Sequence, residues 1–301
     1  MSGTKGKIAV LGGDLREKVL LAKLVEKDFT VMVAARSSEM TPNGISITTD
    51  IKQALRDADC LVLPMPGLRE DNKIFAASGH RLYLTEEDLS LLPAGTPILV
   101  GVANDLLQKA VQKYKLELLP MAGENAIAIP NAMATAEGAI AIAISESPLL
   151  LAKSIGIIIG YGRVGRALAL RLQALGMQLI VVDKDKEVLV QAQKNGFSVM
   201  QSKFCSQIAD QVDFIFNTAP APVIDKEMIE KLKENTLIVD IASFPGGTDF
   251  VAAKEIGIKA LLAAGLPGKY APYFMGEVLA KVYLPIIEEK VLHLSKRRED
   301  Q

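Results

Sequence analysis

The chain has 301 residues, of which 34 are basic and 35 acidic, and half of all residues are apolar. This length allows two domains of ordinary size, each with its own hydrophobic core. The nearly balanced charge excludes the basic surface that is typical of nucleic-acid-binding proteins. We therefore expect a globular protein with no nucleic-acid partner.

The cysteines and the apolar segments indicate a cytoplasmic protein. Cys60 and Cys205 are too few for a disulfide framework and fit a reducing compartment. The opening letters MSGTKGKIAVLGG pass from a polar leader directly into a strand, unlike a secretory signal. Residues 126–144 are apolar, but Pro130 and Glu137 interrupt them, so we expect a buried loop and helix and no membrane span. With two histidines and no cysteine cluster, we expect no metal site.

The first part of the chain alternates short apolar strands with helical stretches. Strands are expected at residues 7–11, 30–34, 60–63, 97–100 and 116–119, with helices at 15–27, 51–56, 85–91 and 105–113. This alternation predicts a mostly parallel sheet with helices on both faces. The domain so formed would cover residues 1–130.

A linking segment follows, and we place it at residues 131–150. Residues 125–130 resemble a loop, and residues 133–145 an alanine-rich helix buried on most sides. Glu137 is the one charged residue between Asn125 and Glu146. In such surroundings a carboxylate needs a partner or has a raised pKa. Glu137 is therefore either part of a structural ion pair or a member of the active site.

The rest of the chain repeats the strand–helix alternation. Strands are expected at residues 155–159, 179–182, 198–200, 214–217, 237–240 and 259–262, with helices at 166–175, 186–195, 203–209, 226–232 and 250–255 and a turn at 264–267. A final helix at 273–291 contains Pro285, which should kink it or split it. The fold class is α/β, with two tandem Rossmann-like, doubly wound parallel-sheet domains. The second domain would span residues 151–270, and the terminal helix residues 271–301.

Residues 154–176 carry the most informative motif. An apolar strand ends in Gly160-Tyr161-Gly162-Arg163-Val164-Gly165, which is G-x-G-x-x-G, and a helix follows. The glycines permit the tight turn, the approach of backbone to a pyrophosphate, and close packing of helix on strand. Asp183, at the end of the next strand, is placed to bind the ribose hydroxyls of the adenosine. Its charge favours NAD over NADP, although Lys184 beside it weakens that preference.

Further ligand contacts are expected from the loops that follow the strands of the second domain. The expected cofactor-binding residues are Gly160, Tyr161, Gly162, Arg163, Val164, Gly165, Asp183, Lys184, Asn217, Thr218, Ala219, Pro220 and Ala242. The loop 243–248, with its Pro-Gly-Gly run, would present backbone N–H groups near the nicotinamide.

In the first domain, the turn Gly12-Gly13-Asp14 lacks the third glycine of a dinucleotide fingerprint. Its open helix N-terminus could hold an anion, or Asp14 could simply cap the helix. Arg16 lies in the first helical turn, where the helix dipole does not stabilise a cation. We therefore consider a ligand or ion-pair role for Arg16, with a solvated arginine as the alternative.

These features indicate a nicotinamide-dependent oxidoreductase. A 2-hydroxyacid dehydrogenase is the default, but it needs a base, usually histidine. His80 and His293 do not follow strands of the second domain, which weakens this alternative. A non-catalytic dinucleotide-binding protein is the other alternative.

The chain resembles the A subunit of dipicolinate synthase from about Lys7 to the terminal helix. The shared stretches include IAVLGGD at 8–14, TAEGAI at 135–140, the glycine fingerprint, DIAS at 240–243, PGGTDF at 245–250 and GLPG at 265–268. The resemblance implies oxidation of dihydrodipicolinate, or of its hydroxylated tetrahydro precursor from the lysine pathway, to dipicolinate with NAD or NADP. It places the protein in the mother cell of a sporulating bacterium. It also implies a flavoprotein-like partner, the B subunit of dipicolinate synthase, and we expect a homo-oligomer.

The substrate of such an enzyme is a small planar dicarboxylate, which needs anion-binding groups. Glu137 and Ser243 are the expected catalytic residues, with Glu137 accepting the ring proton as hydride leaves. The expected substrate-binding residues are Gly13, Asp14, Arg16, Thr135, Gly246, Gly247 and Thr248.

Overall fold

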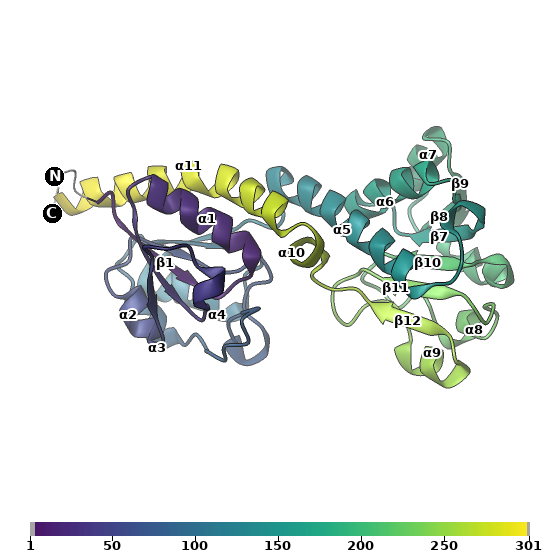
Figure 1. Ribbon diagram of the computed structural model, residues 1–301, viewed down its shortest axis with the longest axis horizontal. Helices are drawn as coiled ribbons and strands as arrows, with labels where there is room; N and C mark the ends of the chain where they lie inside the picture. The colour runs from purple at the N-terminus through teal and green to yellow at the C-terminus, as the bar shows by residue number, and fades with distance from the viewer. Residues whose placement is uncertain (1–3, 300–301) are drawn as a thin grey trace. The chain divides into compact units, whose positions relative to one another are not determined.

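The computed structural model describes residues 4–299 and divides into two compact units (Figure 1). Unit 1 comprises Met1–Pro130 and Pro272–Gln301, and unit 2 comprises Asn131–Ala271. The chain therefore crosses from one unit to the other twice. Each unit is a parallel sheet covered by helices on both faces, as the strand–helix alternation predicts.

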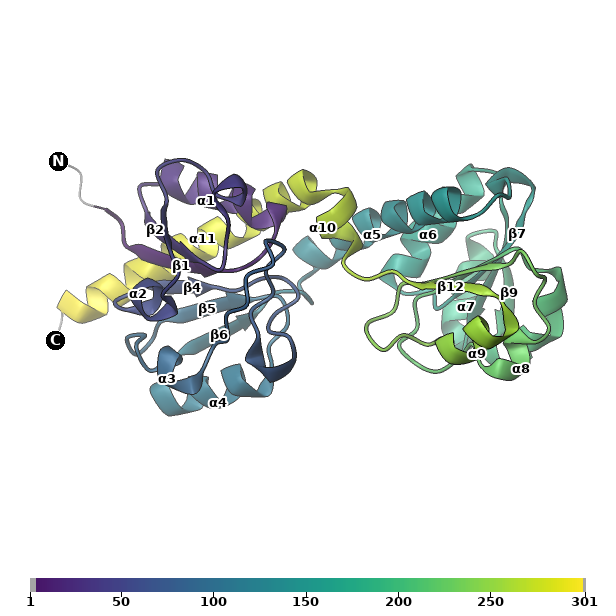
Figure 2. The ribbon, with the colours of Figure 1, turned by 60° about the horizontal axis from the view of Figure 1, so that its bottom comes forward.

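Unit 1 contains a six-stranded parallel sheet with the order β3-β2-β1-β4-β5-β6 (Figure 2). Its strands are β1 (Lys7–Leu11), β2 (Thr30–Ala34), β3 (Ser46–Thr48), β4 (Cys60–Val62), β5 (Pro97–Val100) and β6 (Glu117–Pro120). Its helices are α1 (Leu15–Glu26), α2 (Ile51–Leu55), α3 (Glu86–Leu89), α4 (Asp105–Tyr114) and α11 (Pro272–Glu299). β3 has only three residues, largely exposed, and the sequence pattern did not indicate it.

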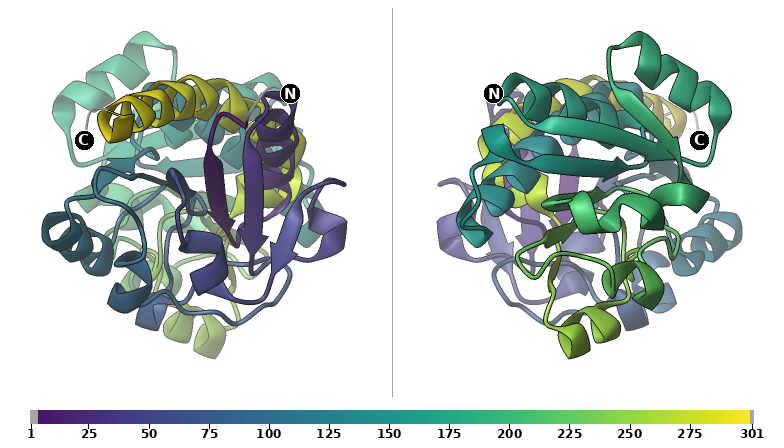
Figure 3. Two further views of the ribbon diagram at one scale, coloured as in Figure 1. Left: turned by 90° about the vertical axis from the view of Figure 1, so that its left-hand side faces the viewer. Right: turned by 90° about the vertical axis from the view of Figure 1, so that its right-hand side faces the viewer.

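Helix α11 belongs to unit 1, where it packs beside α1 on one face of the sheet (Figures 1 and 3). Leu279, Tyr283, Ile287 and Val291 recur every four residues and form the buried stripe of this helix. A Cβ at Gly276 would lie 2.7 Å from the Cβ of Val19, so the glycine permits the close approach of the two helices. Pro285 was expected to kink the helix or to split it, and the split is wrong. The helix continues through the proline because buried contacts hold it on both sides.

Unit 2 contains a second six-stranded parallel sheet, with the order β12-β11-β10-β7-β8-β9. Its strands are β7 (Ile155–Ile159), β8 (Gln178–Asp183), β9 (Ser198–Gln201), β10 (Phe214–Asn217), β11 (Leu237–Asp240) and β12 (Lys259–Leu262). Its helices are α6 (Arg163–Ala174), α7 (Lys186–Lys194), α8 (Lys226–Ile229), α9 (Phe250–Ile256) and α10 (Leu266–Tyr270). Counted within each unit, both sheets have the strand order 3-2-1-4-5-6 of a Rossmann fold, so the predicted fold class is confirmed.

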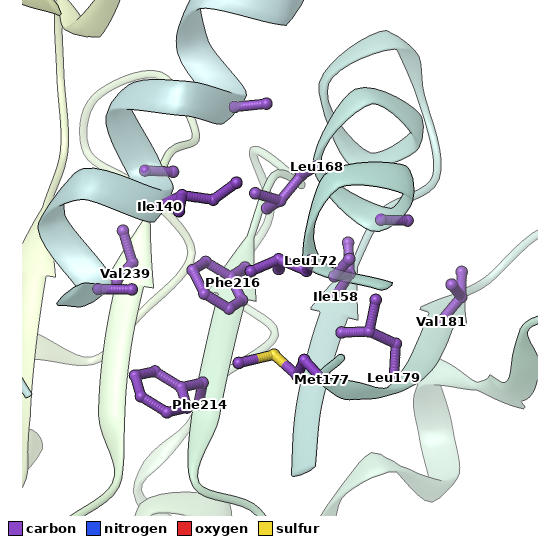
Figure 4. Packing of buried hydrophobic residues seen from close by; sticks show 14 of the residues in the cluster. Ile140, Ile158, Leu168, Leu172, Met177, Leu179, Val181, Phe214, Phe216 and Val239 are labelled. Carbon is purple, nitrogen blue, oxygen red and sulfur yellow. The ribbon is translucent and has the colours of Figure 1, made fainter. Parts of the chain in front are cut away.

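The core on one face of the second sheet is apolar and partly aromatic (Figure 4). Phe214 and Phe216 of β10 lie with ring centroids 6.1 Å apart. They pack with Ile158 of β7, Leu172 of α6 and Ile140 of α5 (Asn125–Glu146). A second cluster fills the opposite face below α8 and α9. Both faces of the strands are therefore covered, which explains their continuous apolar sequences.

Two local expectations are wrong. Residues 125–130 are the first turns of α5 and not a loop, with Pro130 inside the helix. The helix expected at 203–209 is present as a 3₁₀ helix, Ser202–Gln211. The expected turn at 264–267 leads into α10, which has Pro267 in its first turn, where proline is tolerated.

Helix α5 is half exposed, whereas a helix buried on most sides was expected. Among the helices in residues 4–299 it is the single one long and apolar enough to cross a membrane, and 50% of its most apolar window is buried. Such partial burial is typical of a helix that packs one side against a folded core.

Candidate dinucleotide and substrate site

The second sheet has a topological switch point between β7 and β10, where the strand order reverses. In open α/β sheets, ligands bind beyond the carboxyl ends of the strands at such a point. The glycine turn, residues 160–165, follows β7, and residues 218–224 follow β10. We therefore build the candidate site from the loops at this edge of the sheet.

The three glycines of the turn have separate structural roles. Gly160 has φ +92°, a conformation that favours glycine. A Cβ at Gly165 would collide with the carbonyl oxygen of Gly160, so this glycine permits helix and strand to pack closely. At Gly162 a Cβ would meet no atom within 4 Å, and this position faces open space. The space beside Gly162 is where backbone can approach a ligand.

The N-terminus of α6 is available to an anion. Gly162 is its N-cap and, as a glycine, has no side chain that could cap the first N–H groups. The helix has 12 residues, so its first N–H groups and its dipole favour negative charge at this end. The turn therefore fits the pyrophosphate of a dinucleotide.

Tyr161 contributes to this turn through its backbone. Its side chain is buried in the core, where the ring lies edge-on to Phe197 at 5.9 Å and the hydroxyl accepts a hydrogen bond from Asn195. Only the backbone of Tyr161 can reach a cofactor. Arg163 is exposed and Val164 half-buried at the start of α6.

Asp183 ends β8 beside the glycine turn. Its carboxylate accepts hydrogen bonds from the backbone N–H of Tyr161 at 2.9 Å and of Asp185 at 3.0 Å. Asp183 is half-buried and Lys184 exposed. The carboxylate therefore fixes the turn and, with lone pairs to spare, can still accept bonds from ribose hydroxyls.

A buried carboxylate that the sequence analysis missed organises the next two loops. Asp240, at the end of β11, has no exposed surface. Its Oδ1 accepts hydrogen bonds from Asn217 Nδ2 at 3.0 Å and Ala242 N at 3.1 Å. Its Oδ2 accepts from Gly247 N at 2.8 Å and Thr248 Oγ1 at 2.7 Å. An acid directly after an apolar strand, as at Asp183, was the available signal.

These bonds change the expected role of Asn217. Its side chain is buried and holds Asp240 and the backbone of Ala219, so it supports the loops and cannot touch a cofactor. The Thr218 hydroxyl lies 3.1 Å from the carbonyl oxygen of Gly160 and ties this loop to the glycine turn. Ala219 is half-buried and Pro220 exposed, both at the edge of the site.

The Pro-Gly-Gly loop, residues 242–248, is packed tightly against residues 219–224. A Cβ at Gly247 would collide with the carbonyl oxygen of Ala221, and Gly246 has φ +88°. The carbonyl oxygen of Gly247 accepts hydrogen bonds from the N–H groups of Val223 and Ile224. The three loops thus form one hydrogen-bonded rim in which Ser243 is exposed and Ala242 is buried.

The two predicted site residues of α5 have partners within unit 2. The Thr135 hydroxyl is largely buried and donates to the carbonyl oxygen of Asn131 at 2.7 Å. The Glu137 side chain is 65% exposed and pairs with Arg171 at 3.4 Å. The expectation of a buried Glu137 is wrong, because the half-exposed α5 turns this side chain outward. The structure shows the ion pair, and the exposed carboxylate of Glu137 is still accessible to a ligand.

The expected open anion site in unit 1 is closed by the protein's own carboxylates. Asp14 caps α1 and accepts hydrogen bonds from the N–H and Nε of Arg16, both at 2.9 Å. Glu17 accepts from the N–H of Asp14 at 2.7 Å, and the N–H of Gly13 donates to Phe75. These bonds occupy the backbone N–H groups of Gly13, Asp14 and Arg16, which an external anion would need.

This cluster is buried and electrically balanced. Asp14, Arg16, Glu17 and Arg36 are all buried. Burial alone would raise the pKa of Asp14, but the hydrogen bonds and charge of Arg16 hold it below its usual value. Burial and the Asp14 charge raise the pKa of Glu17. Arg16 is neither solvated nor free, so the expected substrate contacts of Gly13, Asp14 and Arg16 have no open donor here.

Comparisons with known proteins match the two units to two different family models. Residues 7–122 match the family model for the N-terminal domain of the dipicolinate synthase A subunit. Residues 135–263 match the model described as S-adenosyl-L-homocysteine hydrolase, NAD binding domain. Fold and site together define a protein of two Rossmann-like units whose second unit is an NAD-binding domain.

The similarity extends along the chain. The A subunit of dipicolinate synthase from Bacillus subtilis (strain 168) is 29% identical over 287 residues, which cover 94% of this chain and 96% of that protein. The crystal structure of the A subunit from Bacillus halodurans matches with a TM-score of 0.87 at 29% identity, over 94% of this chain and 98% of that one. A transhydrogenase of Sinorhizobium meliloti, with 16% identity and a TM-score of 0.68, shares the fold over 94% of each chain. The chain is a homologue of the dipicolinate synthase A subunit.

Proposed function

We propose that this protein oxidises dihydrodipicolinate, or its hydroxylated tetrahydro precursor, to dipicolinate with NAD⁺ or NADP⁺. The observation that carries the proposal is similarity to the A subunit of dipicolinate synthase over 94% of the chain. The dihydropyridine loses a hydride to the nicotinamide and a proton to a base, which leaves an aromatic ring. The hydroxylated form loses one water in addition. We place this reaction in the mother-cell cytoplasm of a sporulating bacterium.

The glycine turn would hold the cofactor. The N-terminus of α6, whose N-cap is a glycine, and the open space beside Gly162 suit a pyrophosphate. Asp183 would bind the ribose hydroxyls and repel a 2′-phosphate, so we propose NAD⁺ as the preferred acceptor, with NADP⁺ weaker. When bound, the nicotinamide supplies the hydride chemistry, and the protein has to orient the substrate and accept a proton.

The rim beyond β11 would bind the dicarboxylate. The exposed Ser243 offers a hydroxyl donor, and the neighbouring Pro-Gly-Gly backbone is rigidly held by Asp240. Glu137 is our proposed proton acceptor, because its carboxylate is 65% exposed and its ion-pair partner is a single side chain at 3.4 Å. Both residues belong to unit 2, like the glycine turn.

The test is a coupled assay on the whole chain. Dihydrodipicolinate, generated from its lysine-pathway precursor, is mixed with NAD⁺ or NADP⁺, with and without the dipicolinate synthase B subunit as the proposed partner. We expect reduced nicotinamide and dipicolinate to appear in equal amounts, faster with NAD⁺. Cofactor binding without product under every condition would favour the non-catalytic alternative, and turnover of 2-hydroxyacids would favour the 2-hydroxyacid dehydrogenase instead. Sedimentation of the same sample tests the proposed homo-oligomer.

A further inference from the structure

One aromatic side chain at the candidate site is almost fully exposed. Phe244 lies in the Pro-Gly-Gly loop between β11 and α9, and its exposed fraction is 79%. No other large apolar side chain in residues 4–299 is as exposed. Isolated apolar residues on a surface are ordinary, so exposure alone assigns no role. The role follows from the position of Phe244 and from the rigidity of its loop.

The loop that carries Phe244 is fixed on both sides of the ring. Before it, Ala242 N donates to the buried Asp240 at 3.1 Å. After it, Gly246 N donates to the carbonyl oxygen of Ser243 at 2.9 Å, and Gly247 N donates to Asp240 at 2.8 Å. An exposed side chain on a mobile loop could fold back onto the surface. The backbone around Phe244 is instead anchored to the core, and the side chain is exposed.

The position of the loop relates Phe244 to the proposed substrate. Along the sheet, β8 lies on one side of β7, and β10 and then β11 lie on the other. With the pyrophosphate at the β7 turn and the adenosine toward Asp183 on β8, the nicotinamide half extends toward β10. The loop after β11 is two strand spacings, about 10 Å, from β7. A substrate that reacts with the nicotinamide would therefore lie near this loop.

We propose that Phe244 is a specificity-determining residue that stacks on the ring as it becomes planar and favours planar over puckered six-membered rings. This inference rests on the proposed function, in which a dihydropyridine dicarboxylate becomes a flat pyridine dicarboxylate when hydride and proton leave. Aromatic rings prefer offset-stacked or edge-to-face contact with another π-system. A saturated ring of the same size offers no flat face for such contact. The exposed Ser243 hydroxyl would recognise a carboxylate of either ring equally.

The experiment compares two dicarboxylates in binding to the whole chain saturated with NAD⁺. Pyridine-2,6-dicarboxylate is the planar probe and piperidine-2,6-dicarboxylate the puckered one, and isothermal titration gives both dissociation constants. We expect F244L to weaken binding of the pyridine about three- to tenfold and to change that of the piperidine less than about twofold. F244Y should restore the preference. V251A, at a side chain that is 69% exposed on the same unit, is the control and should behave like the wild type.

Each result has a distinct meaning. If F244L keeps the wild-type ratio of the two dissociation constants, the assignment of Phe244 is overturned while the proposed function stands. If F244L instead loses NAD⁺ affinity, Phe244 supports the cofactor and its assignment to the substrate is likewise overturned. If the wild type binds NAD⁺ but neither dicarboxylate, the proposed function fails and this inference fails with it.

Discussion

Replacement of Asp240 by asparagine should destabilise unit 2 more than any other Asp→Asn or Glu→Gln substitution in that unit. The carboxylate is fully buried and accepts four hydrogen bonds, two on each oxygen. An asparagine keeps one oxygen and places an NH₂ group where the other was. If the oxygen remains toward Asn217 and Ala242, the new NH₂ faces Gly247 N and Thr248 Oγ1. The threonine hydroxyl can reverse and accept a bond, but the Gly247 N–H cannot.

The magnitude follows from these contacts. D240N loses two hydrogen bonds to a charged group, each contributing about 1.5–3 kcal/mol, and leaves one buried donor without an acceptor. The reversed Thr248 hydroxyl and the removal of a buried charge recover part of this loss. We expect the free energy of unfolding to fall by about 2–4 kcal/mol. For a unit of this size that corresponds to a decrease in Tm of about 6–12 °C.

Thermal and urea unfolding of the whole chain, followed by circular dichroism, measure this change. D225N is the matched control, because Asp225 is an exposed N-cap of α8 that accepts one bond from Met228 N. Asparagine is an equally good N-cap, so D225N should stay within about 0.5 kcal/mol of the wild type. A D240N variant as stable as D225N would refute the view that Asp240 anchors the loops.

Three further predictions concern α1 and α5. Because the pKa of Glu17 is raised above its ordinary 4.5 in the folded state, the unfolded chain releases this proton first, and the free energy of unfolding falls as pH rises above about 4.5. E17Q can keep the capping bond to Asp14 N but should lack this pH-dependent contribution. The stability of E17Q relative to the wild type, measured by urea unfolding, should therefore increase with pH. A difference that is constant with pH would contradict this. R16M should cost about 3–5 kcal/mol in urea unfolding, because it leaves the Asp14 carboxylate buried without its cation, and a loss below about 1 kcal/mol would count against the buried pair. E137Q should alter stability by less than about 1 kcal/mol, because the Glu137 ion pair with Arg171 is largely exposed, yet lower kcat at unchanged NAD⁺ affinity; full turnover would exclude Glu137 as the proton acceptor.

The sequence predicted those parts of the fold that depend on local pattern. Short apolar runs such as residues 155–159 and 237–240 alternate with amphipathic helices, and this alternation indicates parallel sheets wherever the partners lie. The glycine turn could also be predicted, because two of its glycines are required by backbone geometry within a few residues. Gly160 has a positive φ, and Gly165 lies close to the backbone of Gly160. The helical turns at 125–130 were not predicted, although Pro130 lies within α5.

The candidate site was less predictable because its polar groups are matched across the fold. Arg36 was not singled out, yet it donates to the carbonyl oxygens of Gly12 and Asp14 and lies 4.0 Å from Glu17. Arg36 is distant in sequence from Gly12, Asp14 and Glu17, so the sequence alone does not indicate that they pair. Asp240 was passed over for the same reason, since its donors come from two other loops. The burial of Glu137 was inferred from its apolar neighbours in sequence, but a helix exposes one side whatever its mean hydropathy.

NAD⁺ titration of a G162A variant shows whether the glycine turn of unit 2 holds the dinucleotide against bare backbone. Gly162 has φ −75°, which alanine adopts freely, and an added Cβ meets no protein atom within 4 Å. G162A should therefore fold with an unchanged Tm, while its methyl group intrudes on the pyrophosphate. We expect calorimetric titration to show NAD⁺ affinity at least about tenfold weaker than in the wild type, a loss of about 1.4 kcal/mol or more. Wild-type affinity in a correctly folded G162A would contradict the account.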